Sequence, residues 1–485
     1  MSSGGITILG LGPGNPGQLT RDAWEILQTC DELYVRTRQH PVILALPAHI
    51  NVLSFDHLYE EGDSFEVVYE QIVYQVLELG RREQGVIYAV PGHPFVAEAT
   101  SPEIVRRAQK VDMPVRIVEG LSFLEPTFTA LGVDPLPQLT VMDAMEVAHH
   151  HAPLFPPHMP VLIAQIYSSL VASEVKLTLN VLYPDRHPVK LVHAAGTDNE
   201  VVEELALYQI DRSPHIGLMT ALYVPPLGDG TSFEEFLDVV AHLRAPEGCP
   251  WDREQTHMSL RTTLLEETYE VLDALDKEDI AGLQEELGDL LLQIYLHAQI
   301  AVDEGEFTMA NVVQGIYTKI LRRHPHVFAR IEVEGVQGVL VNWERIKAEE
   351  RAAKGKEETS LLDGVTKTLP ALTQADQYLK RVARVGFDWP DLQAVLAKLQ
   401  EELKEVDHAL DGDEKLHEVG DLLLAVVNLA RWIKVDPESA LRQANLRFKK
   451  RFRYIESTAK KQGRPIAELS LDEMQSLWQE AKNLH

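Results

Sequence analysis

Residues 264–275, LLEETYEVLDAL, and residues 399–410, LQEELKEVDHAL, decide the fold of the C-terminal half of this 485-residue chain. Each segment combines apolar residues at helical spacing with carboxylates three residues apart. Farther along, LQEELGDLLLQI at 283–294 is echoed by KLHEVGDLLLAV at 415–426. This half therefore contains one helical unit twice, and we expect it to be almost entirely α-helical.

The repeated carboxylates form the first candidate site. Glu267 and Glu270 are three residues apart, as are Glu286 and Asp289, so each pair lies on one face of its helix. If the two helices pack antiparallel, four carboxylates converge, and bound cations must offset their repulsion. Ligands that are all oxygen atoms suit Mg²⁺ or Mn²⁺ better than zinc. A solvated helix face is the alternative for any single pair. A di-iron bundle is disfavoured because neither copy has the Glu-x-x-His motif.

A basic and aromatic set follows the carboxylates in each copy. Two cations are four residues apart, and a Trp precedes a Lys by the same spacing. The candidate substrate-binding residues are Lys319, Arg323, Trp343, Lys347, Arg447, Arg451, Trp478 and Lys482. Lys and Arg neutralise phosphate, whereas a Trp ring either stacks on a base or packs in the core. The repetition of the whole set favours an anionic nucleotide as the ligand.

Composition narrows the class of protein. The chain has 45 Lys and Arg against 74 Asp and Glu, a formal charge of −29, which argues against a binder of nucleic-acid polymers. Cys30 and Cys249 cannot form a disulfide framework or a CxxC metal site. The N-terminus lacks the basic and apolar regions of a signal peptide, and no apolar run is long enough to span a membrane. These features predict a soluble cytoplasmic protein.

The N-terminal half has the alternating pattern of an α/β domain. Short β-branched apolar runs, such as ITILGLG at 6–12 and VIYAVPG at 86–92, alternate with helical stretches. Further candidate strands are ELYVRT at 32–37, VRIVEG at 115–120, VLIAQIY at 161–167 and VKLVHAAG at 189–196. The turn-rich segment VPPLGDG and the polar segment at 351–367 mark two boundaries. We therefore expect three domains, at 1–226, 227–355 and 356–485.

A glycine-rich loop follows the first predicted strand. GLGPGNPGQLT at 10–20 allows a ligand to approach the backbone, but a tight strand-to-helix turn explains it equally well. Pro13 and Pro16 make a Rossmann dinucleotide site a poor fit, and the loop has no Walker lysine. The loop alone therefore does not identify a ligand.

Residues 240–350, with GCPWDREQTH, LLEETYEVLDAL, EELGDLLLQIYLHAQIA and RRHPHVF, resemble the MazG family of nucleoside triphosphate pyrophosphohydrolases. Residues 368–485 resemble a second MazG unit through LQEELKEVDHAL, HEVGDLLLAVVNLARW and ANLRFKKRFRYIE. The resemblance implies Mg²⁺-dependent hydrolysis of a nucleoside triphosphate to a nucleoside monophosphate and pyrophosphate. It implies metal ligands Glu267, Glu270, Glu286 and Asp289 in the first unit, and Glu402, Glu405, Glu418 and Asp421 in the second. It also implies catalytic carboxylates Glu266, Glu267, Glu401 and Glu402, of which Glu266 and Glu401 orient the attacking water.

The second unit departs from the first in two ways. Fifteen residues separate the two acid groups in the first copy and twelve in the second, and the second copy lacks the GCPWD and RRHPHVF segments. The resemblance therefore leaves open which unit is the more active.

Residues 4–225 resemble the tetrapyrrole methylase fold through GLGPGNPGQLT, AVPGHPFVAEAT and VEGLSFLEPTF. That fold binds S-adenosylmethionine between two α/β lobes. The resemblance implies cofactor-binding residues Gly12, Pro13, Gly14, Pro91, Gly92, His93, Thr100, Ser101 and Ser122. His93 stands where these methylases commonly have Asp, so we expect weak or absent cofactor binding.

The preferred hypothesis is a homodimeric enzyme that removes nucleoside triphosphates from the nucleotide pool. The first alternative is an S-adenosylmethionine-dependent methyltransferase whose helical half serves oligomerisation or regulation. The second is a protein that senses nucleotides without hydrolysing them. The duplicated acid pairs with their matching basic sets favour the first hypothesis.

Overall fold

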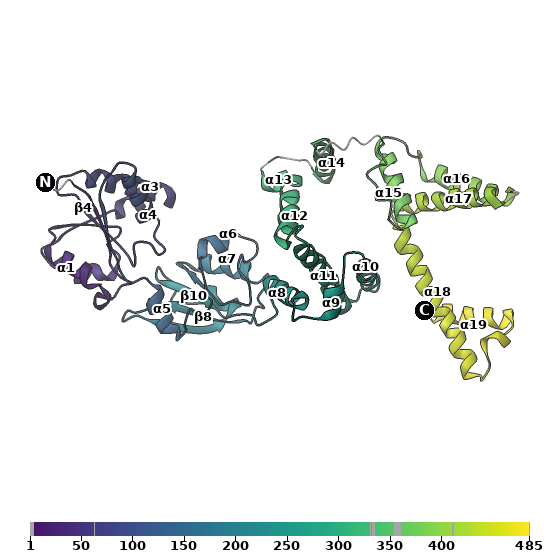
Figure 1. Cartoon of the computed structure of the whole chain (residues 1–485), viewed down its shortest axis with the longest axis horizontal. Coiled ribbons are helices and arrows are strands. Elements are labelled where there is room, and N and C mark those ends of the chain that lie inside the picture. The colour runs from purple at the N-terminus through teal and green to yellow at the C-terminus, as the bar shows by residue number, and fades with distance from the viewer. Residues whose placement is uncertain are drawn as a thin grey trace. The chain divides into compact units, whose positions relative to one another are not determined.

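The computed structural model describes residues 4–62, 64–329, 331, 335–353, 360–409 and 412–484. The chain separates into two compact units, Met1–His242 and Leu243–His485. Figure 1 shows strands only in the N-terminal half and helices from α8 onward. The expected combination of an α/β domain with a helical half is confirmed.

The first lobe of the N-terminal unit is a five-stranded sheet with strand order β3-β2-β4-β1-β5. All its neighbouring strands are parallel. The strands are β1 (Ile6–Gly10), β2 (Glu32–Val35), β3 (Asn51–Ser54), β4 (Val86–Val90) and β5 (Val115–Val118). Helices α3 (Phe65–Gly80) and α4 (Thr100–Gln109) bury apolar side chains in one core cluster, and α1 (Arg21–Thr29) buries them in another. Apolar cores on both faces are typical of a parallel sheet, whose strands are continuous apolar runs.

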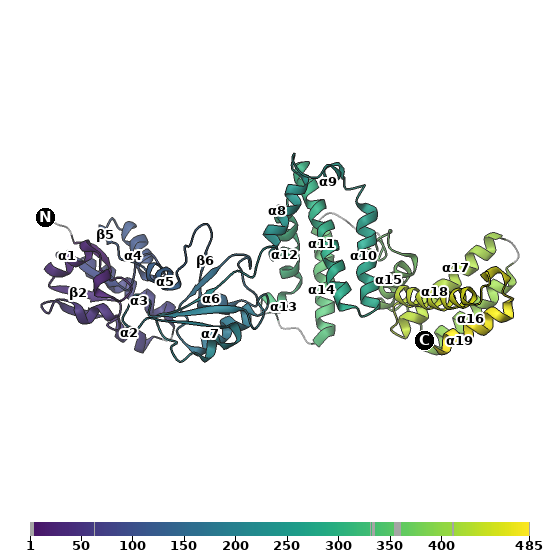
Figure 2. The same ribbon diagram turned by 90° about the horizontal axis from the view of Figure 1, so that it is seen from below.

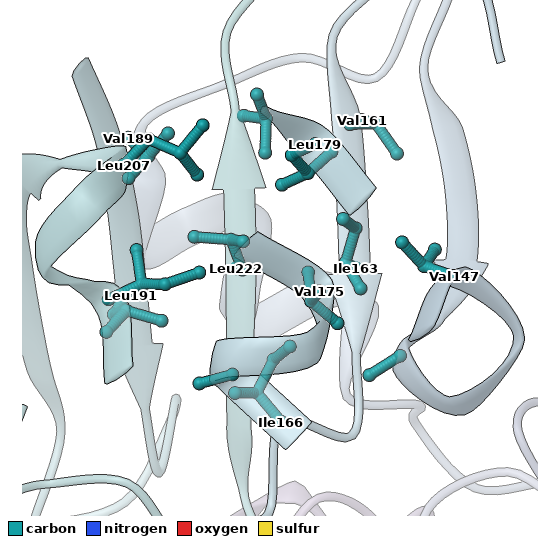
Figure 3. Close-up of a cluster of buried hydrophobic side chains, with 14 of the residues drawn as sticks. Val147, Val161, Ile163, Ile166, Val175, Leu179, Val189, Leu191, Leu207 and Leu222 are labelled. Atoms are coloured by element: carbon teal, nitrogen blue, oxygen red, sulfur yellow. The ribbon is translucent and has the colours of Figure 1, made fainter. Parts of the chain in front are cut away.

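The second lobe is a mixed sheet with strand order β6-β7-β10-β8-β9, in which only β6 and β7 are parallel. Its strands are β6 (Thr140–Asp143), β7 (Val161–Ala164), β8 (Pro188–His193), β9 (Val201–Ala206) and β10 (Thr220–Val224). Figure 3 shows Ile163, Leu191 and Leu222 of the sheet packed with Val175 and Leu179 of α7 (Ser169–Leu179). Helix α6 (Ala144–His149) adds Val147 to the same cluster, and α5 (Leu124–Leu131) adds Leu131 to a second.

Four strands of these sheets were not predicted from the sequence: β3, β6, β9 and β10. Three of them lie at sheet edges, where many of their side chains are partly or fully exposed, so they lack a continuous apolar run. The fourth, β10, is central and mostly buried, so burial alone did not make it evident from the sequence. The six predicted strands are present at the expected places.

The described residues from 233 onward contain helices and no strands. The longer helices are α8 (Phe233–Arg244), α10 (Arg261–Asp276), α11 (Ile280–Asp303), α12 (Met309–Arg323), α14 (Gly335–Ala353), α15 (Ala371–Arg384), α16 (Leu392–His408), α17 (Gly412–Trp432), α18 (Pro437–Lys461) and α19 (Leu471–Asn483). No helix in the described part of the chain is both long and apolar enough to cross a membrane. The predicted boundary at 355 and 356 lies outside the described residues.

The repeated segments form two helical hairpins. Helices α10 and α11 lie beside each other in the first hairpin (Figure 2), and α16 and α17 form the second. In the first, the chain reverses over residues 277–279, and the Asp279 side chain accepts the Gly282 N–H at 3.0 Å to cap α11. The hairpin brings acids that are far apart in the sequence onto one surface.

Candidate active site

Three carboxylates converge in the first hairpin. Glu267 and Glu270 come from α10 and Glu286 from α11, and ligand oxygens of the three lie within 4.8 Å of one another. Glu267 and Glu270 are three residues apart, so both project from one face of α10 toward α11. Three convergent carboxylates offer oxygen atoms of the kind that a hard cation prefers.

The electrostatics of this cluster are those of crowded like charges. Loss of water raises the pKa of Glu267, and the charges of Asp289 and Glu270 raise it further. The pKa of Glu286 is raised by the same two kinds of effect, with Glu270 the strongest neighbouring charge. Keeping all the carboxylates ionised without a metal is therefore unfavourable. A bound divalent cation would offset their repulsion.

The second hairpin repeats the arrangement. Glu402 and Glu405 of α16 and Glu418 of α17 also place ligand oxygens within 4.8 Å of one another. Glu402 is buried, with 6% of its surface exposed. Loss of water and the charge of Glu402 raise the pKa of Glu405. Two equivalent carboxylate clusters thus lie on two equivalent hairpins.

The second cluster contains a cation that the sequence analysis did not single out. The Lys398 ammonium lies 2.7 Å from a Glu401 oxygen and 2.8 Å from a Glu402 oxygen. Thr263 occupies the equivalent position in the first copy. The signal was available in the sequence, because a lysine three and four residues before two glutamates lies on their helix face.

The remaining predicted acids lie beside the clusters. Asp289 and Asp421 are exposed and fall outside the two groups of three, although the Asp289 charge acts on Glu267. Glu266 is exposed on α10, and Glu401 is exposed and paired with Lys398. The roles of these four residues as ligands or water-orienting groups remain predictions.

The predicted basic and aromatic sets lie on α12 and α14 in the first copy. Lys319 is exposed, and Arg323 is paired with Glu350 of α14 at 2.7 Å. The Lys347 ammonium lies 4.1 Å from the centroid of the Trp343 ring. Trp343 and Lys347 of α14 thus contact each other, and Arg323 of α12 pairs with a carboxylate of α14.

In the second copy these sets lie on α18 and α19. The Arg451 guanidinium is 5.7 Å from the centroid of the Trp478 ring, which also contacts Phe448. Arg447 and Lys482 are exposed. A contact between a cation and a Trp ring thus occurs in both copies, and the cation at the Trp478 ring is Arg451.

The predicted cofactor loops meet at the carboxyl end of the parallel sheet. Gly12 and Gly92 exchange two backbone hydrogen bonds, of 3.2 and 2.8 Å, and both have positive φ. A side chain at Gly10 would lie 2.6 Å from the backbone nitrogen of Gly120, so only glycine permits this approach. A pocket beside these loops is lined by Gln18, Leu121, Glu125, Pro126, Thr129, Gly196 and Glu200.

The polar side chains predicted for this cofactor have different partners. The Thr100 and Tyr88 hydroxyls are 2.9 Å apart, and Ser122 donates to Glu125 at 2.6 Å. The Ser101 hydroxyl is buried without a hydrogen-bond partner among the described residues. The His93 Nδ1 accepts the Phe95 N–H at 3.0 Å, which fixes this imidazole within its own loop.

Comparison with known proteins identifies both halves. The MazG nucleotide pyrophosphohydrolase domain model matches residues 255–328, and the tetrapyrrole (corrin/porphyrin) methylase model matches residues 5–211. The chain is 44% identical to the uncharacterized protein YabN of Bacillus subtilis, over 99% of each chain.

The helical half has a named relative. It is 43% identical over 253 residues to the nucleoside triphosphate pyrophosphohydrolase/pyrophosphatase MazG of Thermotoga maritima, covering 52% of this chain and 96% of the relative. Among solved structures, uroporphyrin-III-C-methyltransferase from Thermus thermophilus matches 46% of this chain and 93% of that chain, with 19% identity and a TM-score of 0.36.

Fold, carboxylate clusters and matches together define a protein of two parts, an α/β methylase-like domain followed by a helical nucleotide pyrophosphohydrolase domain. The chain belongs to the MazG family. The resemblances to MazG and to the tetrapyrrole methylases are both confirmed.

Proposed function

We propose that the helical half hydrolyses nucleoside triphosphates, both NTPs and dNTPs, to the monophosphate and pyrophosphate with Mg²⁺ as cofactor. The convergence of Glu267, Glu270 and Glu286 carries the proposal, together with its repetition in the second hairpin. The name of the Thermotoga maritima relative, 43% identical over the same half, supports the reaction type.

The residues present fit a hard divalent cation. The first cluster offers only carboxylate oxygens from two helices, and loss of water together with the repulsion between its members raises the pKa values of Glu267 and Glu286. Mg²⁺ prefers oxygen ligands, and when bound it would neutralise the triphosphate and lower the pKa of the attacking water. Glu267, Glu270 and Glu286 would hold it, with Asp289 adding negative charge at the same surface.

The chain's own groups would then position the reactants. Glu266 precedes the cluster on α10 and would accept the proton of the attacking water, as Glu401 would in the second unit. The cations Lys319 and Lys347 would bind phosphate oxygens, and the Trp343 ring would stack on the base. No covalent intermediate is required.

The test is incubation of the full chain with a panel of NTPs and dNTPs plus Mg²⁺, with pyrophosphate and orthophosphate detected separately. We expect pyrophosphate as the first product. Release of orthophosphate alone, or binding without turnover, would contradict the proposal. The second outcome would favour a nucleotide sensor.

A further inference from the structure

A second type of ligand group lies at the open end of the first hairpin. His257 is in the connection between α9 (Pro250–Glu254) and α10, Glu304 follows the last residue of α11, and Glu306 lies two residues beyond. Each offers a ligand atom, and these atoms lie within 4.8 Å of one another. His257 is half-buried and the two carboxylates are exposed, so the group can be reached from solvent.

His257 is held in place by another imidazole. The Nδ1 atoms of His257 and His297 are 2.8 Å apart, and the two rings lie edge to edge with 4° between their planes. One of the two Nδ1 atoms must carry a proton and donate it to the other. When the proton is on Nδ1 of a neutral His257, its Nε2 has a lone pair that can bind a metal. His297 and Glu304 are seven residues apart and so share one side of the α11 end. This is the usual arrangement of a histidine ligand oriented by a second group.

Asp303, the carboxylate that precedes Glu304, is already in an ion pair. Asp303 pairs with Arg244 at 2.7 Å, and that guanidinium also donates to the Asp252 carbonyl. The donor set is therefore one imidazole nitrogen and two carboxylates.

This group is separate from the carboxylate cluster. Glu286 and His297 are eleven residues apart on α11, a rise of about 16 Å along the helix. One cation cannot occupy both places. The two donor sets also differ in chemistry, because the cluster near Glu286 offers only oxygen.

We propose that His257, Glu304 and Glu306 form a transition-metal site, with Zn²⁺ as the best-suited common ion. Imidazole with carboxylates suits Zn²⁺, whereas sites composed only of oxygen ligands suit Mg²⁺. A bound ion would tie the segment before α10 to the end of α11 and so fix the hairpin that carries the carboxylate cluster. The site does not depend on the proposed hydrolysis.

The experiment is a calorimetric titration of the full chain with Zn²⁺ in the presence of excess Mg²⁺, which occupies the oxygen-only clusters. We expect a Zn²⁺ site that weakens at least tenfold in His257→Ala and in the surface variant Glu304→Gln/Glu306→Gln. His297→Ala should weaken Zn²⁺ binding about 10- to 100-fold, the usual effect of losing an orienting partner. The matched control is His242→Ala, an exposed histidine of α8, which should bind Zn²⁺ like the wild type.

Two results would overturn the proposal. One is the absence of Zn²⁺ binding by the wild type, or Zn²⁺ binding by the Glu304→Gln/Glu306→Gln variant that equals that of the wild type. The other is binding lost only when the carboxylate clusters are neutralised by Glu286→Gln and Glu418→Gln. Because the two exposed glutamates contribute nothing to the core, circular dichroism of their variant should match the wild type and exclude unfolding as the cause.

Discussion

At the scale of single residues, Lys398 distinguishes the two clusters. Its ammonium pairs with Glu401 and Glu402, and these carboxylates raise the pKa of Lys398 above its usual value. A resident cation competes with a divalent ion for the same oxygens. We expect Lys398→Thr, which copies Thr263 of the first unit, to tighten Mn²⁺ binding to the second cluster about two- to fivefold.

This difference can be measured by titrating Mn²⁺ into a background in which Glu286→Gln and Asp289→Asn disable the first cluster. Lys398→Arg keeps the charge and serves as the control, so its Mn²⁺ affinity should stay near that of the background. The reciprocal change Thr263→Lys, with the second cluster disabled instead, should weaken binding to the first. Equal affinities in all these variants would refute the role of Lys398.

The carboxylates of the first cluster predict a pH dependence of metal stabilisation. The pKa values of Glu267 and Glu286 are raised, so the folded metal-free cluster holds protons at a pH where the unfolded chain has lost them. This stabilising contribution is lost as the pH rises through the raised folded pKa, and bound Mg²⁺ replaces the lost protons.

The rise in melting temperature caused by Mg²⁺, relative to chelator, should therefore be larger at about pH 7 than at about pH 5. Thermal melts at the two pH values check this. A variant with both clusters neutralised should show little effect of Mg²⁺ at either pH. The same increment at both pH values in the wild type would contradict the prediction.

Sequence spacing was sufficient to place Glu267, Glu270 and Glu286 together, because helical periodicity and an antiparallel turn leave few alternatives. The contact between His257 and His297 could not be predicted, since the two residues are forty positions apart and helical periodicity relates only residues of the same helix. Nor does spacing specify that Arg323 pairs with Glu350, a choice set by the packing of α12 and α14.

At the scale of elements, the two hairpins are separate units of the proposed activity. We expect Glu286→Gln/Asp289→Asn and Glu418→Gln/Asp421→Asn each to remove part of the pyrophosphate release. The quadruple variant should lose at least about 100-fold, because water activation needs the bound metal. Initial rates of pyrophosphate release measure this, with circular dichroism to confirm that the helices remain folded. Normal turnover by the quadruple variant would show that the site lies elsewhere.

The loop that follows β4 gives a second prediction at this scale. A carboxylate near a cationic sulfonium adds favourable charge, whereas the His93 imidazole adds none. We expect weak or absent binding of S-adenosylmethionine by the wild type and at least about tenfold tighter binding by His93→Asp. Calorimetry on the full chain checks this, with the exposed His49→Asp as the charge-matched control. Tight binding by the wild type would overturn the prediction.

The predictability of most strands followed their burial, with the central strand β10 as an exception. Strand β1 was evident because its two faces contribute Ile8 and Leu9 to different cores, which requires a continuous apolar run. Edge strand β9 has a half-exposed sequence, VVEELA, with acids at two of its six positions, and this resembles a helix as much as a strand. Tertiary pairing with β8, which local sequence does not encode, decides its conformation.

At the scale of the whole molecule, apolar side chains on the helical half remain uncovered in the single chain. Examples on α10, α11 and α12 are Leu265, Leu287 and Ile316, with 55%, 49% and 49% of their surfaces exposed. Apolar surface of this extent favours association. We expect a homodimer, with light scattering giving twice the 54.5 kDa of one chain. The mass of one chain at micromolar concentration would refute it, and Ile316→Glu should shift any dimer toward monomer.

The two hairpins differ in length at the tip that lies beyond their clustered carboxylates. After the last clustered carboxylate of the first helix, α10 continues for six residues from Glu270 to Asp276, whereas α16 continues for three residues from Glu405 to His408. Three residues are close to one helical turn, so shortening the tip leaves the acids on the same face and at the same depth. The tip is thus a spacer whose length can vary without moving the clustered carboxylates. The turn at 277–279 is accordingly a suitable place to insert an affinity tag or a fluorescent reporter.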